Sequence, residues 1–186
     1  MNQILDHAAD HVAQAALAEL QFFCEQRLCG VRSPELTEHE LREFERRLPA
    51  LIDSLLTRGP QIVNWLSSML ETLESPAEIC GTVVVLLESR EPRAIQAVIS
   101  MLPAAADGPK RLGLMMALRR GPIEALVESL QKLCDSADSP AAAMAVETLA
   151  YHGRLSPDRR KYVSKLQVDA DPAVRQAAWR ALAYSQ

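Results

Sequence analysis

The sequence has few aromatic residues, few glycines and only short apolar runs, and these shortages exclude several classes of protein. Aromatics make up 4% of the 186 residues, and the seven glycines form no Gly-rich phosphate loop. Apolar runs such as 83–87 are far shorter than the roughly 20 residues of a membrane-spanning helix. Residues 1–10 lack the basic region and apolar stretch of a secretion signal. We therefore expect a cytoplasmic protein with no membrane partner.

The sequence also lacks a recognisable metal site or catalytic motif. Its four cysteines, Cys24, Cys29, Cys80 and Cys134, form no zinc-type pair and have no partnered histidine that the spacing can identify. They are interpreted as reduced thiols that pack like small apolar side chains. We therefore predict no enzyme activity, no catalytic residue, no metal and no cofactor.

Histidine pairs offer only a weak metal hypothesis. Two imidazoles, those of His7 and His11, are four residues apart and could share one helix face, but no third ligand is identifiable. The sequence His39-Glu40 is similar to the pairs of HEAT-type iron hydroxylases, yet one pair cannot build a diiron site. Glu40 is better explained as the capping partner of Thr37.

Basic residues are too few for nucleic acid to be the expected ligand. The formal net charge is −4, whereas binding to phosphates normally requires a basic surface. The charge is uneven, because residues 151–186 hold seven Lys and Arg against three Asp and Glu. This polarity can orient a protein partner, and a solvated gradient without function is the alternative.

What the sequence has in quantity is alanine, leucine and regularly spaced proline. Eight prolines recur at intervals of 13 to 18 residues, and each precedes about three turns of helix-patterned sequence. Proline at the first helical position loses no intrahelical hydrogen bond, so these positions predict helix starts. Capping residues precede several of them, namely Ser75, Ser139, Ser156 and Asp171. The prolines are Pro60, Pro76, Pro92, Pro109, Pro122, Pro140, Pro157 and Pro172.

Alternate prolines define two sets of helices. Those at 76, 109, 140 and 172 are 31 to 33 residues apart and open similar segments, which we name first helices. Those at 60, 92, 122 and 157 open the second helices. A period of this length with short loops is typical of a solenoid, in which stacked neighbours complete the core.

The N-terminal third has a different pattern. It predicts a helix over 6–28 and another over 38–58, the second opened by a capping box of Thr37 and Glu40 and kinked or broken near Pro49. The expected fold is all-α: an α-solenoid with an N-terminal two-helix cap. The domains are a cap over 1–58 and a repeat array over 59–186, with about three helix pairs plus terminal helices.

The last segment identifies a candidate repeat family. Residues 169–183 read DADPAVRQAAWRALA. This stretch resembles the HEAT-like repeat shared with phycobilisome-lyase-type proteins, with an acid, proline, Val-Arg, paired alanines and Ala-Leu. The earlier first helices are similar to degenerate copies that keep the proline and the apolar positions. The resemblance implies that the expected solenoid is built from HEAT-like helix pairs.

A second resemblance covers most of the chain. Three consecutive parts carry it: Phe22-Phe23 through Arg27, then LREFERRLPALIDSLL, then the helix pairs. In this order they resemble an uncharacterised group of proteobacterial HEAT-like proteins whose genes accompany type VI secretion components. The resemblance implies an accessory role in effector handling or in toxin neutralisation by an immunity protein. It transfers no functional residues.

The leading hypothesis is therefore a bacterial protein–protein interaction scaffold whose groove is lined by the second helices. Alternatives are a nucleic-acid-binding or enzymatic protein similar to the HEAT-like DNA glycosylases, and a self-assembling structural module; the oligomeric state stays open. The predicted partner-binding residues are the outward polar positions Asn64, Ser68, Arg93, Gln96, Glu124, Glu128, Gln131, Arg160, Lys161 and Lys165.

Tryptophan is enriched at binding hot spots, but both Trp65 and Trp179 are predicted to pack in the core. The last helix complicates this prediction because it opens a repeat that has no second helix. Its residues Val174, Ala178 and Trp179 cannot all be buried unless Arg175, Gln176 and Arg180 cover the outer side.

Overall fold

The computed structural model describes residues 2–30, 37–104 and 108–185, and no strand occurs in these ranges. The chain is all-helical there, as predicted. Its elements are α1 (Asn2–Gly30), α2 (Glu38–Leu56), α3 (Pro60–Met69), α4 (Pro76–Ser89), α5 (Pro92–Ala104), α6 (Gly108–Arg120), η1 (Glu124–Leu126), α7 (Val127–Leu133), α8 (Ser139–Tyr151), η2 (Pro157–Arg159), α9 (Arg160–Leu166) and α10 (Pro172–Tyr184).

Seven of the eight spaced prolines lie at the first or second position of a helix, and Pro122 precedes η1 by two residues. The predicted helix starts are thus largely confirmed. Asp171 caps α10 by accepting the Ala173 N–H at 2.8 Å. The cap of α8 is Asp138 rather than the predicted Ser139, because the helix begins one residue earlier than expected. Ser75 occupies the cap position of α4 without a side-chain hydrogen bond.

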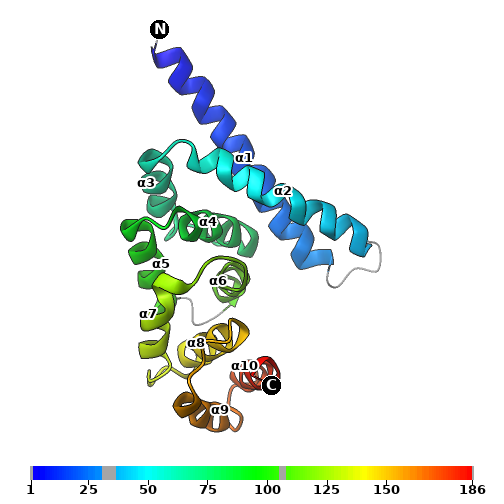
Figure 1. Cartoon of the computed structure of the whole chain (residues 1–186), viewed down its shortest axis with the longest axis vertical. Coiled ribbons are helices and arrows are strands. Elements are labelled where there is room, and N and C mark those ends of the chain that lie inside the picture. Colours follow the sequence, from blue (N-terminus) through cyan, green and yellow to red (C-terminus); the bar gives the residue numbers. More distant parts are fainter. Residues whose placement is uncertain (1, 31–36, 105–107, 186) are drawn as a thin grey trace.

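The helices after residue 59 form two rows (Figure 1). One row holds α4, α6, α8 and α10, and the other holds α3, α5, α7 and α9, so the rows coincide with the two sets of prolines. In the first row α4 contacts α6, α6 contacts α8 and α8 contacts α10. Residues 79–87 of α4 and 141–150 of α8 are buried around the whole helix. Such helices are apolar on all sides because neighbours cover them all round.

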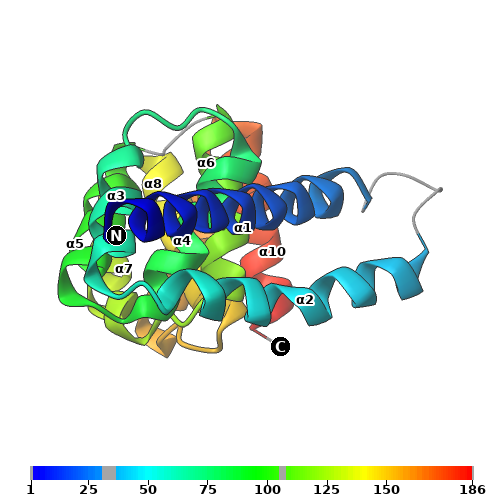
Figure 2. The same cartoon turned by 90° about the horizontal axis from the view of Figure 1, so that it is seen from above.

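The helices α1 and α2 form a long antiparallel hairpin that crosses one end of the rows (Figures 1 and 2). Its apolar side packs on α4 through residues such as Leu20 and Leu55, which are almost fully buried. Of the kink or break predicted near Pro49, the break is wrong, because α2 continues through this proline from Glu38 to Leu56, and the kink stays a prediction. The hairpin therefore covers the apolar face that the first row would expose at this end.

The predicted capping box at the start of α2 is confirmed. The Glu40 carboxylate accepts the Thr37 backbone N–H at 2.8 Å, and the Glu40 backbone N–H donates to the Thr37 hydroxyl at 3.3 Å. The hydrogen bond from the Thr37 backbone lowers the pKa of Glu40 below its usual value.

Replacing Thr37 with alanine should lower the unfolding free energy by about 1 kcal/mol. The Glu40 backbone N–H loses the hydroxyl that accepts it, and the Glu40 carboxylate that accepts the backbone N–H of residue 37 is less well oriented. Since the folded pKa of Glu40 is depressed, its contribution is complete above the unfolded carboxyl pKa and disappears as the pH falls through the folded pKa. Urea unfolding of wild type and Thr37→Ala at neutral and at acidic pH measures this. A Thr37→Ser control should retain the cap, and an equal loss in that variant would contradict the interpretation.

The far end of the first row leaves one large apolar side chain uncovered. On α10, Val174 and Ala178 are fully buried whereas Trp179 is 61% exposed. The expectation that these three cannot all be buried is confirmed, and the prediction that Trp179 packs in the core is wrong. The prediction for Trp65 holds in part, because that side chain is half-buried against the core. The outer side of α10 has no helix beyond it (Figure 1).

Among the described residues, no helix combines the length and apolar character that crossing a membrane requires.

Candidate functional site

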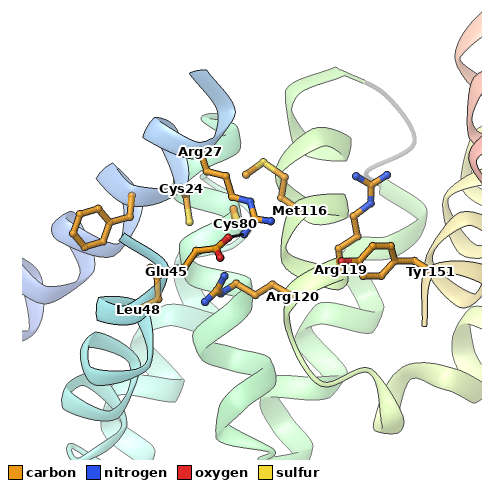
Figure 3. A pocket seen from close by; sticks show the side chains of 10 residues that line it. Cys24, Arg27, Glu45, Leu48, Cys80, Met116, Arg119, Arg120 and Tyr151 are labelled. Carbon is orange, nitrogen blue, oxygen red and sulfur yellow. Dashed lines mark hydrogen bonds and ion pairs between the residues drawn. The ribbon is translucent and has the colours of Figure 1, made fainter. Parts of the chain in front are cut away.

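Three adjoining hollows lie on one face of the molecule. From here on, the groove means the surface formed by the residues that line these three hollows, and not the predicted surface of the second helices. The central hollow has a volume of about 430 Å³ and lies between the hairpin and the first row (Figure 3). A hollow of about 440 Å³ shares Arg120 with it, and one of about 380 Å³ shares Met116 and Arg119. The central hollow is lined by Phe23, Cys24, Arg27, Glu45, Leu48, Cys80, Met116, Arg119, Arg120 and Tyr151. The groove therefore runs from α2 across α4, α6 and α8 to α10.

Arginine is the dominant charged residue of the groove. Arg27 of α1 forms an ion pair with Glu45 of α2 at 2.7 Å, and each side chain is 47% exposed. Arg111 and Arg120 of α6 line the groove and form no ion pair with a carboxylate among the described residues. The central hollow contains three arginines and one carboxylate, so it is electropositive in a chain whose net charge is −4.

A buried carboxylate holds two more of these arginines in place. The Glu147 side chain on α8 is fully buried, and it accepts hydrogen bonds from Arg119 of α6 and from Arg180 of α10. Arg180 binds through two nitrogens, with Nε at 2.6 Å and an Nη at 2.9 Å. These hydrogen bonds raise the pKa of Arg180 above its usual value. The carboxylate thereby connects three consecutive helices of the first row.

Two tyrosines flank this ion cluster. The rings of Tyr151 and Tyr184 meet edge to face with centroids 5.2 Å apart, and the Arg119 guanidinium lies 5.7 Å from the first centroid and 5.9 Å from the second. Both tyrosines are exposed, as is Leu112 of α6. Arginine and tyrosine beside accessible apolar surface are the residue types enriched at protein-binding hot spots.

Two thiols line the central hollow. Cys24 on α1 and Cys80 on α4 are 6% and 3% exposed, and Arg27 and Arg120 lie near both. A hydrogen bond from the Cys80 thiol, assisted by these arginines, lowers the pKa of Cys24, and the same hydrogen bond raises the pKa of Cys80. Cys29 is exposed, whereas burial raises the pKa of Cys134 to about 11. All four thiols are free in the described structure, and Cys24, Cys80 and Cys134 are buried as the packing interpretation expects, whereas Cys29 is not.

The ten residues predicted to bind a partner lie on the other row or in η1, and none of them lines the three hollows of the groove. Asn64, Arg93, Gln96 and Lys161 are exposed and Gln131 is half-buried. The side chain of Arg160 lies outside the described residues. Whether this row binds a partner stays a prediction. The one sequence signal for the groove is the adjacent pair Arg119 and Arg120 at the end of a first helix.

Some of those side chains have partners within the chain. Glu128 forms an ion pair with Lys132 at 2.7 Å, and the Ser68 hydroxyl donates to the Trp65 carbonyl at 2.7 Å. The Lys165 ammonium lies 5.2 Å from the centroid of the Tyr162 ring. Glu124 is exposed.

The histidines do not assemble a metal site in the part of the chain with described side chains, where no group of three or more His, Cys, Asp or Glu residues could hold an ion. His11 and His39 are exposed, and the His7 side chain lies outside the described residues. The His152 ring donates Nε2–H to the Leu118 carbonyl at 2.7 Å, so this residue connects α8 to α6 as well as ending α8.

Comparison with known proteins adds no relative, because no family model, no curated protein and no solved structure matches this chain.

Proposed function

We propose that this chain is an α-solenoid of HEAT-like helix pairs and works as a cytoplasmic binding protein whose groove holds an acidic segment of a protein partner. Support for the repeat assignment comes from the 31- to 33-residue spacing of first helices, the DADPAVRQAAWRALA segment of α10 and the two rows of helices (Figure 1). Repeats of this kind present an extended surface along the stack, which suits a peptide better than a small molecule.

The observation that carries the binding proposal is that two arginines of the groove lack a carboxylate partner within the described chain, in a protein whose net charge is negative. Arg111 and Arg120 have no carboxylate partner among the described residues, so binding an anion there breaks no existing ion pair. Complementary charge accelerates association and fixes the register of the partner. The exposed rings of Tyr151 and Tyr184 beside Arg119 supply apolar surface for side chains between the acids.

A protein segment fits the groove better than nucleic acid does. The hollow at the α2 end carries Asp53 and Glu88, and the central hollow carries Glu45. The phosphates of a nucleic acid would be repelled by these carboxylates, whereas a peptide can place a neutral side chain beside each one. The chain also has a net charge of −4, whereas proteins that bind nucleic acid usually present a basic surface.

Reversing the two unpaired arginines should weaken binding of an acidic peptide. The probe is a short fluorescent peptide of alternating glutamate and leucine blocks, titrated at low and high salt with anisotropy as the readout. Arg111→Glu/Arg120→Glu should lose about tenfold or more in affinity, because two favourable charge contacts become repulsive. The wild-type affinity should fall as salt rises.

The matched control is Arg93→Glu/Lys161→Glu, which changes the net charge equally but lies on the second row, where the sequence predicts the binding surface. This control should keep wild-type affinity. If it weakens binding as much as the groove variant does, the second row is the binding surface and the groove proposal is wrong. Tighter salt-dependent binding of a DNA duplex than of the peptide would favour the nucleic-acid alternative.

The biological role follows from the resemblance to proteins that accompany type VI secretion components. We place the chain, within the binding-protein class, as an accessory in effector handling or as an immunity protein. Affinity capture from the native host followed by mass spectrometry tests this assignment. Recovery of a toxin or a secretion component supports it, and recovery of neither with the wild-type chain contradicts it.

A further inference from the structure

The structure places two cysteines from distant parts of the sequence in one hollow. Cys24 lies in the last turns of α1 and Cys80 lies near the start of α4, and both line the central hollow beside the paired Arg27 and Glu45 (Figure 3). The two thiols lie near enough to shift each other's pKa. The exposed Cys29 and the buried Cys134 line none of the three hollows of the groove.

The helices that carry the two thiols approach closely at this point. A Cβ added at Gly81, the neighbour of Cys80, would lie 3.6 Å from the Gln21 Cα and 3.2 Å from its Cγ. Gln21 precedes Cys24 by less than one helical turn. Because a disulfide needs Cα atoms within roughly 7 Å of each other, such a close backbone crossing is the geometry that permits one.

We propose that Cys24 and Cys80 are a redox-active dithiol that reacts with hydroperoxides to form an intramolecular disulfide between the hairpin and the first row. The proposal is independent of the acidic-peptide function. Cys24 is the attacking thiol and Cys80 the resolving thiol, because the Cys80 thiol and the nearby Arg120 and Arg27 lower the pKa of Cys24 whereas the pKa of Cys80 is raised.

The reaction proceeds in two balanced steps. The Cys24 thiolate attacks one oxygen of the hydroperoxide, the O–O bond breaks, and the alkoxide or hydroxide that leaves takes up a proton. Cys24 is now a sulfenic acid. The Cys80 sulfur then attacks the Cys24 sulfur, the S–O bond breaks, and hydroxide leaves with the Cys80 proton as water. Two thiols and one hydroperoxide give one disulfide, one alcohol or water, and one further water.

The disulfide should join α1 to α4 and stabilise the hairpin on the first row. Closing a long loop of the unfolded chain removes conformational entropy, so the midpoint of thermal unfolding should rise by about 5 to 10 °C on oxidation. The added reductant should reverse the shift.

Intact-mass analysis of the full chain after treatment with hydrogen peroxide tests the proposal. The Cys29→Ser variant lacks the exposed thiol, and its mass should still fall by two hydrogens on oxidation. Peptide mapping should then find the peptides of Cys24 and Cys80 crosslinked. Adding Cys24→Ser or Cys80→Ser to that background should abolish the loss, whereas adding Cys134→Ser should leave it unchanged. The thermal shift should follow the same pattern.

Two results would overturn the proposal. One is oxidation of Cys24 to sulfinic acid in the Cys29→Ser background without a crosslink, which would mean that Cys80 cannot reach it. The other is a Cys29→Ser protein that keeps its reduced mass while the free amino acid cysteine is oxidised under the same conditions. Each serine variant should have the same circular dichroism spectrum as the wild-type protein, which excludes misfolding as the cause of a missing crosslink.

Discussion

Replacing Gly113 with alanine should lower the unfolding free energy by about 2 to 4 kcal/mol, although alanine is the better helix former. Gly113 lies inside α6 where that helix packs on α4. A Cβ at this position would clash with the Pro76 carbonyl oxygen and would lie 2.9 Å from both the Pro76 Cα and the Ile79 Cβ. Backbone atoms at the start of α4 cannot rotate away, so the two helices must move apart.

A second glycine of the same segment provides the matched control. A Cβ at Gly121 would meet the Leu87 Cδ1 at 2.7 Å, but this atom is the end of a side chain that has other rotamers. Gly121→Ala should therefore cost less, about 1 kcal/mol. Urea unfolding monitored by circular dichroism measures both variants. Equal losses at the two positions, or a stabilised Gly113→Ala, would show that α4 and α6 tolerate a wider spacing.

Helix starts and the division into two rows were predictable from the sequence because the signals are local. Proline at the first helical turn and an acid before it act within a few residues, as at Asp171 and Pro172. The same local logic predicted the capping box of Thr37 and Glu40. The break that the same logic allowed at Pro49 does not occur, because packing of the buried Leu48 and Ile52 holds α2 together across the proline.

The groove was not predictable because its residues come together only through packing between helices. Arg119 and Glu147 are 28 residues apart, and Glu147 and Arg180 are 33 apart. The sequence does place these charged residues on first helices, but helical periodicity alone assigns a glutamate in α8 to a solvated face. Only the partners on both sides explain why Glu147 is fully buried.

The sequence-based prediction places the binding surface on the row of second helices, outside this groove, for a related reason. Outward polar residues such as Arg93 and Gln96 are recognisable from the amphipathic pattern of a second helix. The first helices α4 and α8 have no such pattern because neighbours cover them on most sides. Arginines at their ends, such as Arg120, therefore look like solvated helix ends until the hairpin is placed beside them.

Glu147→Ala should be the most damaging loss of a charged group in the chain, with a decrease of about 2 to 4 kcal/mol in the unfolding free energy. The carboxylate is fully buried, and its removal leaves a void as well as two guanidinium groups without an acceptor. The loss stays below that for a wholly buried pair, because Arg119 and Arg180 are 32% and 45% exposed and regain water. Glu147→Gln, which keeps the volume and one acceptor oxygen, should lose less.

Double-mutant cycles separate the two arginines in this cluster. The coupling between Glu147 and Arg180 should exceed 1 kcal/mol, because a two-nitrogen contact with both carboxylate oxygens is stronger than a single hydrogen bond. As a control, Glu128→Ala removes a carboxylate whose only described ion pair, with Lys132, is exposed, and it should leave stability nearly unchanged.

The Glu147 ion cluster also contributes to the interface between α6 and α8. Their interface includes three polar contacts: the Arg119 pair with Glu147, the Thr148 hydroxyl on the Met115 sulfur at 3.7 Å, and the His152 ring on the Leu118 carbonyl. The α4 and α6 interface depends instead on close apolar packing at Gly113. Glu147→Ala should therefore increase amide hydrogen exchange in α8 and α10 while α4 keeps wild-type protection. Uniform loss of protection across all four helices would contradict a local role for the carboxylate.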